Sequence, residues 1–256
     1  MQEILKVSSI KKTFLKDGES NTVINDVSFT VKKGQCVGIV GESGCGKSTT
    51  ARIILGLLNF DEGEIILSEN KLSPQNRIRL KEIQGKIQMV FQMPTESFNP
   101  RIKLGKSIKE AMRKTLTSEE KEVKLKKLFE ECQLSYDLAD RYPKEVSGGQ
   151  CQRAAIARAL ASDPQLLICD EATSALDVTV QYNIMNLLKN IQKNRDMAIL
   201  FICHDIALVQ QFCDYVLVMD KGKIIEEGIP NEVILNPSQM FTQKLISSVK
   251  IGRAHV

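Results

Sequence analysis

Long hydrophobic runs and paired cysteine motifs are both missing from this sequence. The longest purely apolar stretch, MAILFIC at 197–203, is far too short to span a bilayer, and MQEILKVSSIKKTF at the start contains no apolar signal core. The seven cysteines include no CxxC pair, so neither a zinc site nor a disulfide framework is predicted. We therefore expect no membrane-spanning segment, and we expect the cysteines to be buried thiols in a reducing cytosol.

The chain also lacks a large excess of either charge. Its 35 basic and 31 acidic side chains give a formal net charge of +4, which provides no reason to expect a nucleic-acid or membrane-surface partner. With 256 residues, 43% of them apolar, the chain can bury a substantial core. The length fits one large domain or one domain with a sizeable insertion.

Short β-branched runs alternate with helical patterns along most of the chain. Strands are predicted at 22–31, 36–40, 85–92, 165–170, 198–205 and 215–228. Several of these runs are apolar on both faces, which is typical of a covered, mainly parallel sheet. Helical patterns follow the second run and separate the fourth from the fifth, and DKG inside YVLVMDKGKIIEEG predicts a hairpin. The alternation predicts an α/β fold.

The alternation breaks between roughly 95 and 162. TSEEKEVKLKKLFEECQL begins with a capping box formed by Thr117 and Glu120 and continues with helical periodicity. SGGQCQRAAIARALAS reads as a second helix. We therefore expect a helical insertion within the α/β core.

GESGCGKST at 41–49 fits the pattern G-x-x-x-x-G-K-S/T at every fixed position, with a strand-like run before it and a helical run after it. Its glycines would let the backbone wrap a phosphate, so that N–H groups and the helix N-terminus point at the anion. A glycine turn with a solvated lysine is the simpler alternative. The residues predicted to bind nucleotide are Gly41, Ser43, Gly44, Cys45, Gly46, Lys47, Ser48 and Thr49.

Within this loop Lys47 would neutralise the β- and γ-phosphate oxygens, and Ser48 would hold Mg²⁺. A loop that hydrolyses nucleotide also needs an acid that holds the metal and a group that orients water. QLLICDE supplies both, with Asp170 as the metal-holding acid and Glu171 as the general base. Taken alone, these two residues fit a plain acidic pair at a strand end equally well.

SGGQ at 147–150 follows GESGCGKST and precedes ICDE, and in that order the sequence resembles the ATP-binding cassette family. The family signature is normally LSGGQ, whereas Val146 stands in place of the leucine. In isolation, SGGQ would fit a flexible turn before a helix. The resemblance implies ATP and Mg²⁺ as cofactors, with the signature bound to the γ-phosphate of ATP on the opposite subunit's P-loop. The signature residues are Ser147, Gly148, Gly149 and Gln150.

Four further residues match elements of that family in order. Gln92 in MVFQ resembles the Q-loop glutamine, which contacts Mg²⁺ and water. Asp177 ends SALD, which resembles the D-loop that crosses the dimer interface, and His204 resembles the switch histidine that contacts the γ-phosphate. Phe14 resembles the aromatic residue that stacks on adenine, although a lone Phe fits a core position equally well.

The resemblance runs from Phe14 to about Val249 and implies a P-loop NTPase (RecA-like) core with an N-terminal antiparallel β region and an inserted α-helical subdomain. The predicted cassette domain, 1–249, comprises the core at 1–92 and 163–230, the helical subdomain at 93–162 and a C-terminal segment at 231–249. IGRAHV at 251–256 can be encoded by a common sequencing-adapter sequence. We therefore expect the natural chain to end near Val249, with 250–256 a non-native or disordered tail.

Two stretches narrow the class within the family. FQMPTESFNPR at 91–101 and NEVILNPSQMFTQKLISSV at 231–249 resemble segments of the peptide/nickel importer subfamily. The resemblance implies an ATP-hydrolysing subunit at the cytoplasmic face of a bacterial membrane, acting with two permeases and an extracellular solute-binding protein. It also implies a second ATPase subunit, a heterodimer being favoured, and no nucleic-acid partner.

The cargo implied is a metal, a metal chelate or a peptide. Many peptide-importing members of the subfamily continue well beyond this closing pattern, whereas this sequence stops there. The prediction therefore favours a metal or metal chelate as the cargo. The alternative is a soluble cassette ATPase of nucleic-acid repair or translation. Such proteins usually carry a long coiled-coil insertion, a second cassette or a basic groove, and the sequence contains none of these. A nucleotide-binding scaffold without turnover would be expected to lack Glu171 or His204.

Overall fold

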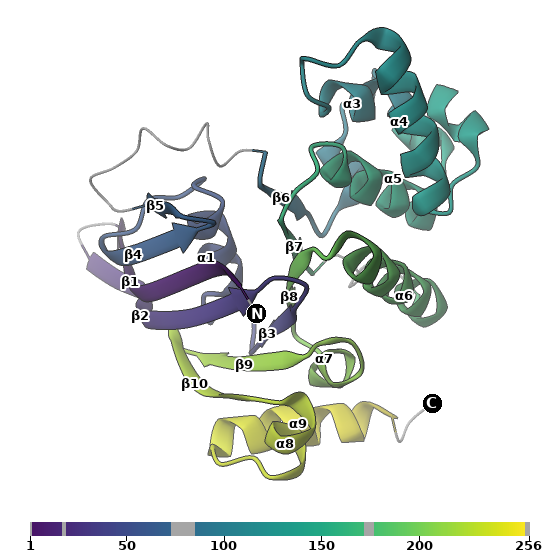
Figure 1. Ribbon diagram of the computed structural model, residues 1–256. Helices are drawn as coiled ribbons and strands as arrows, with labels where there is room; N and C mark the ends of the chain where they lie inside the picture. Colours follow the sequence, from purple (N-terminus) through teal and green to yellow (C-terminus); the bar gives the residue numbers. More distant parts are fainter. Residues whose placement is uncertain (1, 17–18, 73–84, 172–176, 254–256) are drawn as a thin grey trace.

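The computed structural model describes residues 2–16, 19–72, 85–171 and 177–253. Figure 1 shows an antiparallel sheet on the left, a mostly parallel sheet in the centre and a cluster of helices at the upper right. The α/β class predicted from the alternation of strands and helices is therefore confirmed.

The central sheet has six strands in the order β10-β9-β3-β8-β7-β6. Its strands are β3 (Cys36–Val40), β6 (Ile87–Val90), β7 (Leu166–Asp170), β8 (Ala198–Cys203), β9 (Tyr215–Asp220) and β10 (Lys223–Gly228). All neighbouring strands are parallel except β9 and β10, which form the predicted hairpin. Every residue of β3 and β8 is buried, as expected for strands covered on both faces. The phosphate-loop strand β3 thus lies inside the sheet, between β8 and β9.

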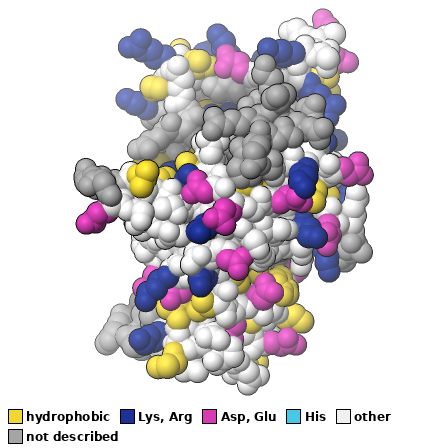
Figure 2. All heavy atoms as spheres, turned by 90° about the vertical axis from the view of Figure 1, so that its left-hand side faces the viewer, with side chains coloured by type: hydrophobic (Ala, Val, Ile, Leu, Met, Phe, Trp, Pro, Cys, Tyr) yellow, Lys and Arg dark blue, Asp and Glu magenta, His cyan; other side chains and the backbone are white. Residues whose placement is uncertain are grey.

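The second sheet is antiparallel, with the order β2-β1-β4-β5. It contains β1 (Glu3–Lys16), β2 (Glu19–Lys32), β4 (Glu62–Leu67) and β5 (Asn70–Leu72). One face of this sheet packs on the core and the other faces water, where Figure 2 shows basic and acidic side chains intermixed. Cross-strand and loop ion pairs such as Lys11–Glu62 (3.1 Å) and Lys12–Asp61 (2.8 Å) account for part of that mixture. The predicted N-terminal antiparallel region is confirmed.

The hydrophobic core occupies both faces of the central sheet. On one face, α1 (Lys47–Ile54) is packed between the two sheets. On the other face, α5 (Gly148–Leu160), α6 (Val178–Arg195) and α7 (Ile206–Phe212) cover the strands. All seven cysteines are free and buried in these cores, as predicted. The short helix α7 was not expected from the sequence.

The inserted helices lie between β6 and β7. They are α3 (Leu104–Glu110), α4 (Ser118–Glu131) and α5, with single turns η1 (Pro94–Ser97), η2 (Tyr136–Asp140) and η3 (Pro143–Glu145). The capping box predicted at the start of α4 is present: Thr117 Oγ1 accepts from the Glu120 amide, and Glu120 Oε2 accepts from the Thr117 amide. The boundaries 93–162 for a separate helical subdomain stay a prediction.

Two helices end the chain, α8 (Pro230–Leu235) and α9 (Met240–Arg253), and both lie beside the β9–β10 edge in Figure 1. The tail that we expected to be non-native or disordered overlaps α9 as far as Arg253, and its origin stays a prediction. Within the described ranges, no helix combines the length and the apolar character that crossing a membrane requires.

Candidate functional site

The phosphate loop connects the end of β3 to the start of α1, as its motif predicted. Gly46, the residue before α1, has φ +112°, and Gly44 has φ +83°. A Cβ on Gly46 would lie 2.7 Å from Ile24 Cδ1 and 2.9 Å from the Val23 carbonyl oxygen. Both the left-handed backbone and the close packing therefore require glycine at position 46.

The Lys47 side chain turns back into its own loop. Its ammonium donates to the carbonyl oxygens of Gly41 (2.8 Å) and Glu42 (2.9 Å), and only 5% of the residue is exposed. No ion pair to Lys47 occurs among the residues that the structure describes. The ammonium also lies 3.8 Å from Cys45 Sγ, and none of these three partners is a carboxylate, so an incoming anion would be its first ionic partner. The loop therefore combines a fixed positive charge with the N-terminus of α1.

The turn between β9 and β10 supports the phosphate loop from behind. The Gly222 amide donates to the Cys45 carbonyl oxygen (2.9 Å), and the Asn25 amide donates to the Gly222 carbonyl oxygen (2.8 Å). Gly222 has φ +78°, and a Cβ there would lie 2.5 Å from the Val23 carbonyl oxygen. Sequence reasoning identified DKG only as a hairpin turn and missed this supporting role, since nothing in the sequence shows which loop the turn contacts.

Ser48 and Asp170 meet beside the phosphate loop. Ser48 Oγ, in the first turn of α1, donates to Asp170 Oδ1 at the end of β7 (3.0 Å). Burial raises the pKa of Asp170 above its ordinary value, against the lowering effect of the Ser48 hydrogen bond, and the negative charge of Glu171 raises it further.

A hydroxyl and a carboxylate are the hard oxygen ligands that Mg²⁺ prefers, and the metal usually takes only one or two protein oxygens beside nucleotide phosphates. The described residues contain no group of three or more His, Cys, Asp and Glu side chains that could hold a metal. Ser48 and Asp170 therefore fit Mg²⁺ that arrives with a nucleotide, rather than a permanently bound metal.

Glu171 and His204 come together at the same edge of the sheet. Because Asp170 pairs with Ile202 in parallel register, β7 and β8 end side by side, and each delivers one of these residues. The distance from His204 Nδ1 to Glu171 Oε1 is 3.8 Å, and their side chains are 62% and 25% exposed. The predicted base and the predicted switch histidine are thus neighbours, although they are 33 positions apart in the sequence.

The backbone of Glu171 is unusual. Its φ is +47°, a left-handed conformation that non-glycine residues rarely adopt, and its amide donates to the Ile202 carbonyl oxygen (2.9 Å). This conformation turns the chain away from β7 immediately after Asp170. Residues held in such strained conformations cluster at functional sites.

Ser147 and Gln150 form a second capping box at the start of α5. Ser147 Oγ accepts from the Gln150 amide (3.2 Å), and Gln150 Oε1 accepts from the Ser147 amide (2.9 Å). Gly148 and Gly149 occupy the first turn of the helix, so the stretch is a fixed helix N-terminus and not a flexible turn. Among the described residues, no hydrogen bond or ion pair joins these four residues to the chain's own phosphate loop.

The remaining predicted site residues lie at separate positions. Gln92 is exposed just after the edge strand β6. Phe14 in β1 is 37% exposed, with the Lys12 ammonium 5.4 Å from the ring centre, so it is not a core residue. Asp177 caps α6 by accepting from the Val180 amide (2.9 Å), while the rest of SALD, 174–176, lies outside the described residues.

Two loop residues complete the predicted set. Ser43 lies exposed in the phosphate loop. Thr49 is half-buried in the first turn of α1.

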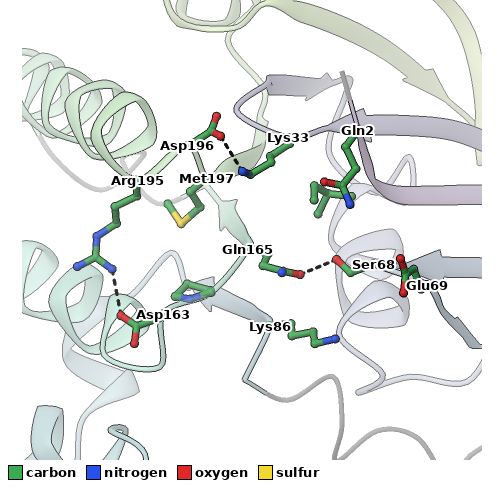
Figure 3. A pocket seen from close by; sticks show the side chains of 12 residues that line it. Gln2, Lys33, Ser68, Glu69, Lys86, Asp163, Gln165, Arg195, Asp196 and Met197 are labelled. Atoms are coloured by element: carbon green, nitrogen blue, oxygen red, sulfur yellow. Dashed lines mark hydrogen bonds and ion pairs between the residues drawn. The ribbon is translucent and has the colours of Figure 1, made fainter.

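A separate cavity of about 570 Å³ lies at the opposite end of the strands, before β7 and β8 begin (Figure 3). None of the predicted site residues lines it. Across this cavity Lys33 pairs with Asp196 (2.8 Å), Arg195 pairs with Asp163 (3.5 Å), and Ser68 Oγ donates to Gln165 Oε1 (2.5 Å).

Further bonds fix the same region to α4. Arg195 also donates to both carboxylate oxygens of Glu131 (2.6 Å each), and Lys124 pairs with Asp163 (2.6 Å). Asp163 and Gln165 belong to the five residues, 161–165, that join α5 to β7. This joint is therefore held by several side-chain bonds and is not a slack loop.

Comparison with known proteins places these features in a family. The family model described as "ABC transporter" matches residues 24–174. The oligopeptide transport ATP-binding protein OppF of Haemophilus influenzae is 42% identical over 96% of this chain and 75% of its own length. OppF of Bacillus subtilis is 39% identical over 98% of this chain and 83% of its own length. AppF of the same species, also an oligopeptide transport ATP-binding protein, is 40% identical, covering 98% and 80%.

Solved structures give the same result. CbiO1 from Clostridium perfringens, part of the cbiONQ transporter complex, superposes with a TM-score of 0.83 at 28% identity, covering 92% of both chains. The ATP-binding cassette MJ0796, in a dimeric post-hydrolysis state bound to ADP and Pi, superposes with a TM-score of 0.79 at 29% identity. That match covers 88% of this chain and 98% of the other.

Proposed function

This chain belongs to the ABC transporter family and hydrolyses ATP, and on that premise we propose that it powers the import of oligopeptides through partner permeases. OppF and AppF, at about 40% identity over nearly the whole chain, are both named for oligopeptide transport. None of these names supports metal uptake, which the sequence analysis favoured. Oligopeptide is therefore the cargo class that we assign.

The observation that carries the proposed mechanism is the meeting of three elements at the carboxyl edge of the central sheet. The phosphate loop follows β3, Asp170 and Glu171 end β7, and His204 follows β8. Lys47 would bind the β- and γ-phosphates, while Ser48 and Asp170 would hold Mg²⁺. When bound, the metal would neutralise charge on the phosphate oxygens.

Glu171 is assigned as the general base. Glu171 directly follows Asp170, the residue that would hold the metal. Its carboxylate would therefore lie close to the γ-phosphate, where the attacking water would approach. His204, with Nδ1 3.8 Å from the Glu171 carboxylate, is placed to orient that carboxylate and to contact the γ-phosphate. The remaining loop residues, Ser43 and Thr49 among them, would line the phosphates.

We infer that the site on one chain is incomplete, because in the part of the chain that the structure describes the Ser147–Gln150 helix N-terminus makes no hydrogen bond or ion pair to its own phosphate loop. We assign it to the γ-phosphate bound by a second cassette, and the dimeric state of the related cassette MJ0796 supports this arrangement. Asp177 and Phe14, both exposed, are assigned to the dimer interface and to adenine, respectively. A heterodimer with a second ATPase subunit remains the favoured assembly.

Permease contact is assigned to the surface around Gln92. Phe91 and Met93 on either side of it are 41% and 45% exposed, which is unusual for large apolar side chains. A partner that covers them would also touch Gln92 and could thereby sense the nucleotide site. The assembly that we propose acts at the cytoplasmic face of the membrane with two permeases and an extracellular solute-binding protein.

The test compares ATP hydrolysis by the purified chain alone with hydrolysis by the chain assembled with its neighbouring ATPase and permeases in lipid nanodiscs. We expect slow turnover alone and faster turnover in the complex, with further stimulation by a binding protein loaded with oligopeptide. Stimulation by a nickel-loaded binding protein instead would overturn the cargo assignment. Full activity of the lone chain, stimulated by nucleic acid and not by permeases, would favour the repair or translation class.

A further inference from the structure

Positive charge is concentrated in one short stretch of the inserted helices. Residues 101–114 contain six basic side chains and one acidic side chain, a net charge of +5. The whole chain has a formal net charge of +4, so the other 242 residues together carry a net charge of −1. A chain that is nearly balanced overall therefore contains one strongly basic stretch.

Four of these cations have no ionic partner among the described residues. Lys103 pairs with Asp140 (3.0 Å) and Lys109 pairs with Glu122 (2.8 Å). The other four form what we call the basic patch: Arg101, Lys106, Arg113 and Lys114. All four are exposed, so their charges face solvent and are available to a partner.

The fold presents the basic patch outward. Helix α3 buries Leu104 and Ile108 against α4 and α5, so Lys106 is left on the opposite side, and Arg113 and Lys114 continue beyond the helix end. In Figure 1, α3 lies beside α4 in the upper part of the helical cluster. In the sequence, the patch begins eight positions after Met93, which with Phe91 is exposed at the proposed permease contact.

We propose that the basic patch binds anionic phospholipid headgroups of the membrane beside the permeases. This inference rests on the proposed function, which places the chain at the cytoplasmic face. Basic residues near an anionic leaflet each contribute about 1 kcal/mol, which corresponds to about fivefold in binding. Four unpaired cations therefore give an upper limit of several hundredfold, which salt would reduce.

The surface fits a layer of headgroups better than it fits a protein segment or a nucleic acid. Of the four cations, only Arg113 lines a described cavity, so the patch is an outward-facing surface and not a groove for an acidic peptide. Residues 101–116 contain no Phe, Tyr or Trp on which bases could stack. A solvent-exposed surface on which four cations outnumber the one exposed carboxylate, Glu110, fits many shallow phosphate contacts at once.

The test measures co-sedimentation of the purified chain with vesicles. Vesicles of phosphatidylglycerol and phosphatidylcholine are compared with vesicles of phosphatidylcholine alone, at about 0.1 M and about 1 M salt, where the Debye length falls from roughly 10 Å to 3 Å. We expect binding only to the anionic vesicles and only at low salt. The variant Arg101→Gln, Lys106→Gln, Arg113→Gln, Lys114→Gln should bind at least tenfold more weakly.

The matched control replaces with Gln four exposed lysines that lie elsewhere and form no ion pair among the described residues: Lys6, Lys189, Lys193 and Lys244. Both quadruple variants lower the net charge equally, so an equal loss of binding would show that only total charge matters and would overturn the proposal. Unchanged vesicle binding combined with loss of permease co-purification would assign the patch to a protein instead.

Melting temperatures confirm that both variants fold. ATP hydrolysis by the assembled complex in neutral-lipid nanodiscs tests the proposed function separately, because it does not depend on anionic lipid. Absent vesicle binding with intact, permease-stimulated hydrolysis would refute the lipid contact alone.

Discussion

Replacing Gly149 with Asp is expected to affect dimer closure and the folding stability of the subunit in opposite directions. Gly149 lies in the first turn of α5, and a Cβ there would meet only Val180 Cγ1, at 3.0 Å. Val180 is half-buried, so its side chain can shift by the small distance needed. Replacing glycine with Asp gains roughly 0.3 kcal/mol of helix propensity, and an acidic side chain at a helix N-terminus gains about 0.3–1 kcal/mol. The free chain should therefore be as stable as the original or slightly more stable.

The effect on the assembled dimer should be opposite and larger. If the N-terminus of α5 contacts the partner's γ-phosphate, the new carboxylate would lie against a phosphate oxygen. At about 4 Å and an effective dielectric constant of about 20, each pair of like charges costs about 4 kcal/mol. This corresponds to roughly a thousandfold loss of ATP-driven closure.

The assay combines three measurements on Gly149→Asp and on its control, Gly149→Ala. The alanine variant introduces the same contact with Val180 without the charge, so it should retain most of the ATPase activity of the complex. The aspartate variant should lose that activity while the isolated chain keeps its melting temperature and its affinity for ATP. Equal activity of the two variants, or a melting temperature lowered by several degrees in the aspartate variant alone, would refute the reasoning.

Four further outcomes are expected. Glu171→Gln should bind ATP normally but lower the steady-state ATPase rate of the complex by about 10²–10⁴-fold, the usual contribution of a general base; a rate within a few-fold of the original would contradict that role. Lys47→Ala should weaken ATP affinity in calorimetry with Mg²⁺ present, and unchanged affinity would show that the loop binds no phosphate. Burial raises the pKa of Asp170 in the folded state above its value in the unfolded chain. The folded state therefore loses stability as the pH rises from the unfolded pKa to the folded pKa. Asp170→Asn should therefore raise the melting temperature of the nucleotide-free chain at pH 7 while weakening Mg²⁺-dependent ATP binding. Arg195→Gln should lower the free energy of unfolding by about 1–3 kcal/mol, because it leaves the half-buried Glu131 carboxylate without its two-point partner; an unchanged melting temperature would show that the pair contributes nothing.

The parts of the fold that could be predicted are those with short-range signals. β3 and β8 are uniformly apolar, α4 carries its capping box, and the phosphate loop has its spacing between a strand and a helix. Each of these signals lies within about 15 residues of sequence. The cassette fold was predicted from the motif order through the family resemblance, and the structure agrees, whereas the strand order was not predicted.

The parts that could not be predicted depend on contacts between distant residues. The left-handed φ of Glu171 and its 3.8 Å approach to His204 arise only once β7 and β8 pair in register. The hydrogen bond from Gly222 to Cys45 depends on the β9–β10 turn reaching the phosphate loop. Helix α7 was not predicted, because IALVQQF is short and only two residues separate it from the apolar strand β8.

The joint between α5 and β7 has a consequence for how two nucleotide sites would influence each other. Helix α5 is 13 residues long, about 20 Å, and begins at Gly148, directly after its capping residue Ser147, while β7 ends at Asp170, next to Glu171. Between them, Asp163 forms ion pairs with Lys124 and Arg195, so a movement of α5 would strain these bonds and the start of β7. In an assembled dimer, ATP bound by the partner would contact the N-terminus of α5. The joint at 161–165 and β7 would then connect that contact to this chain's own Glu171. This continuous segment of backbone would couple ATP hydrolysis at the two sites.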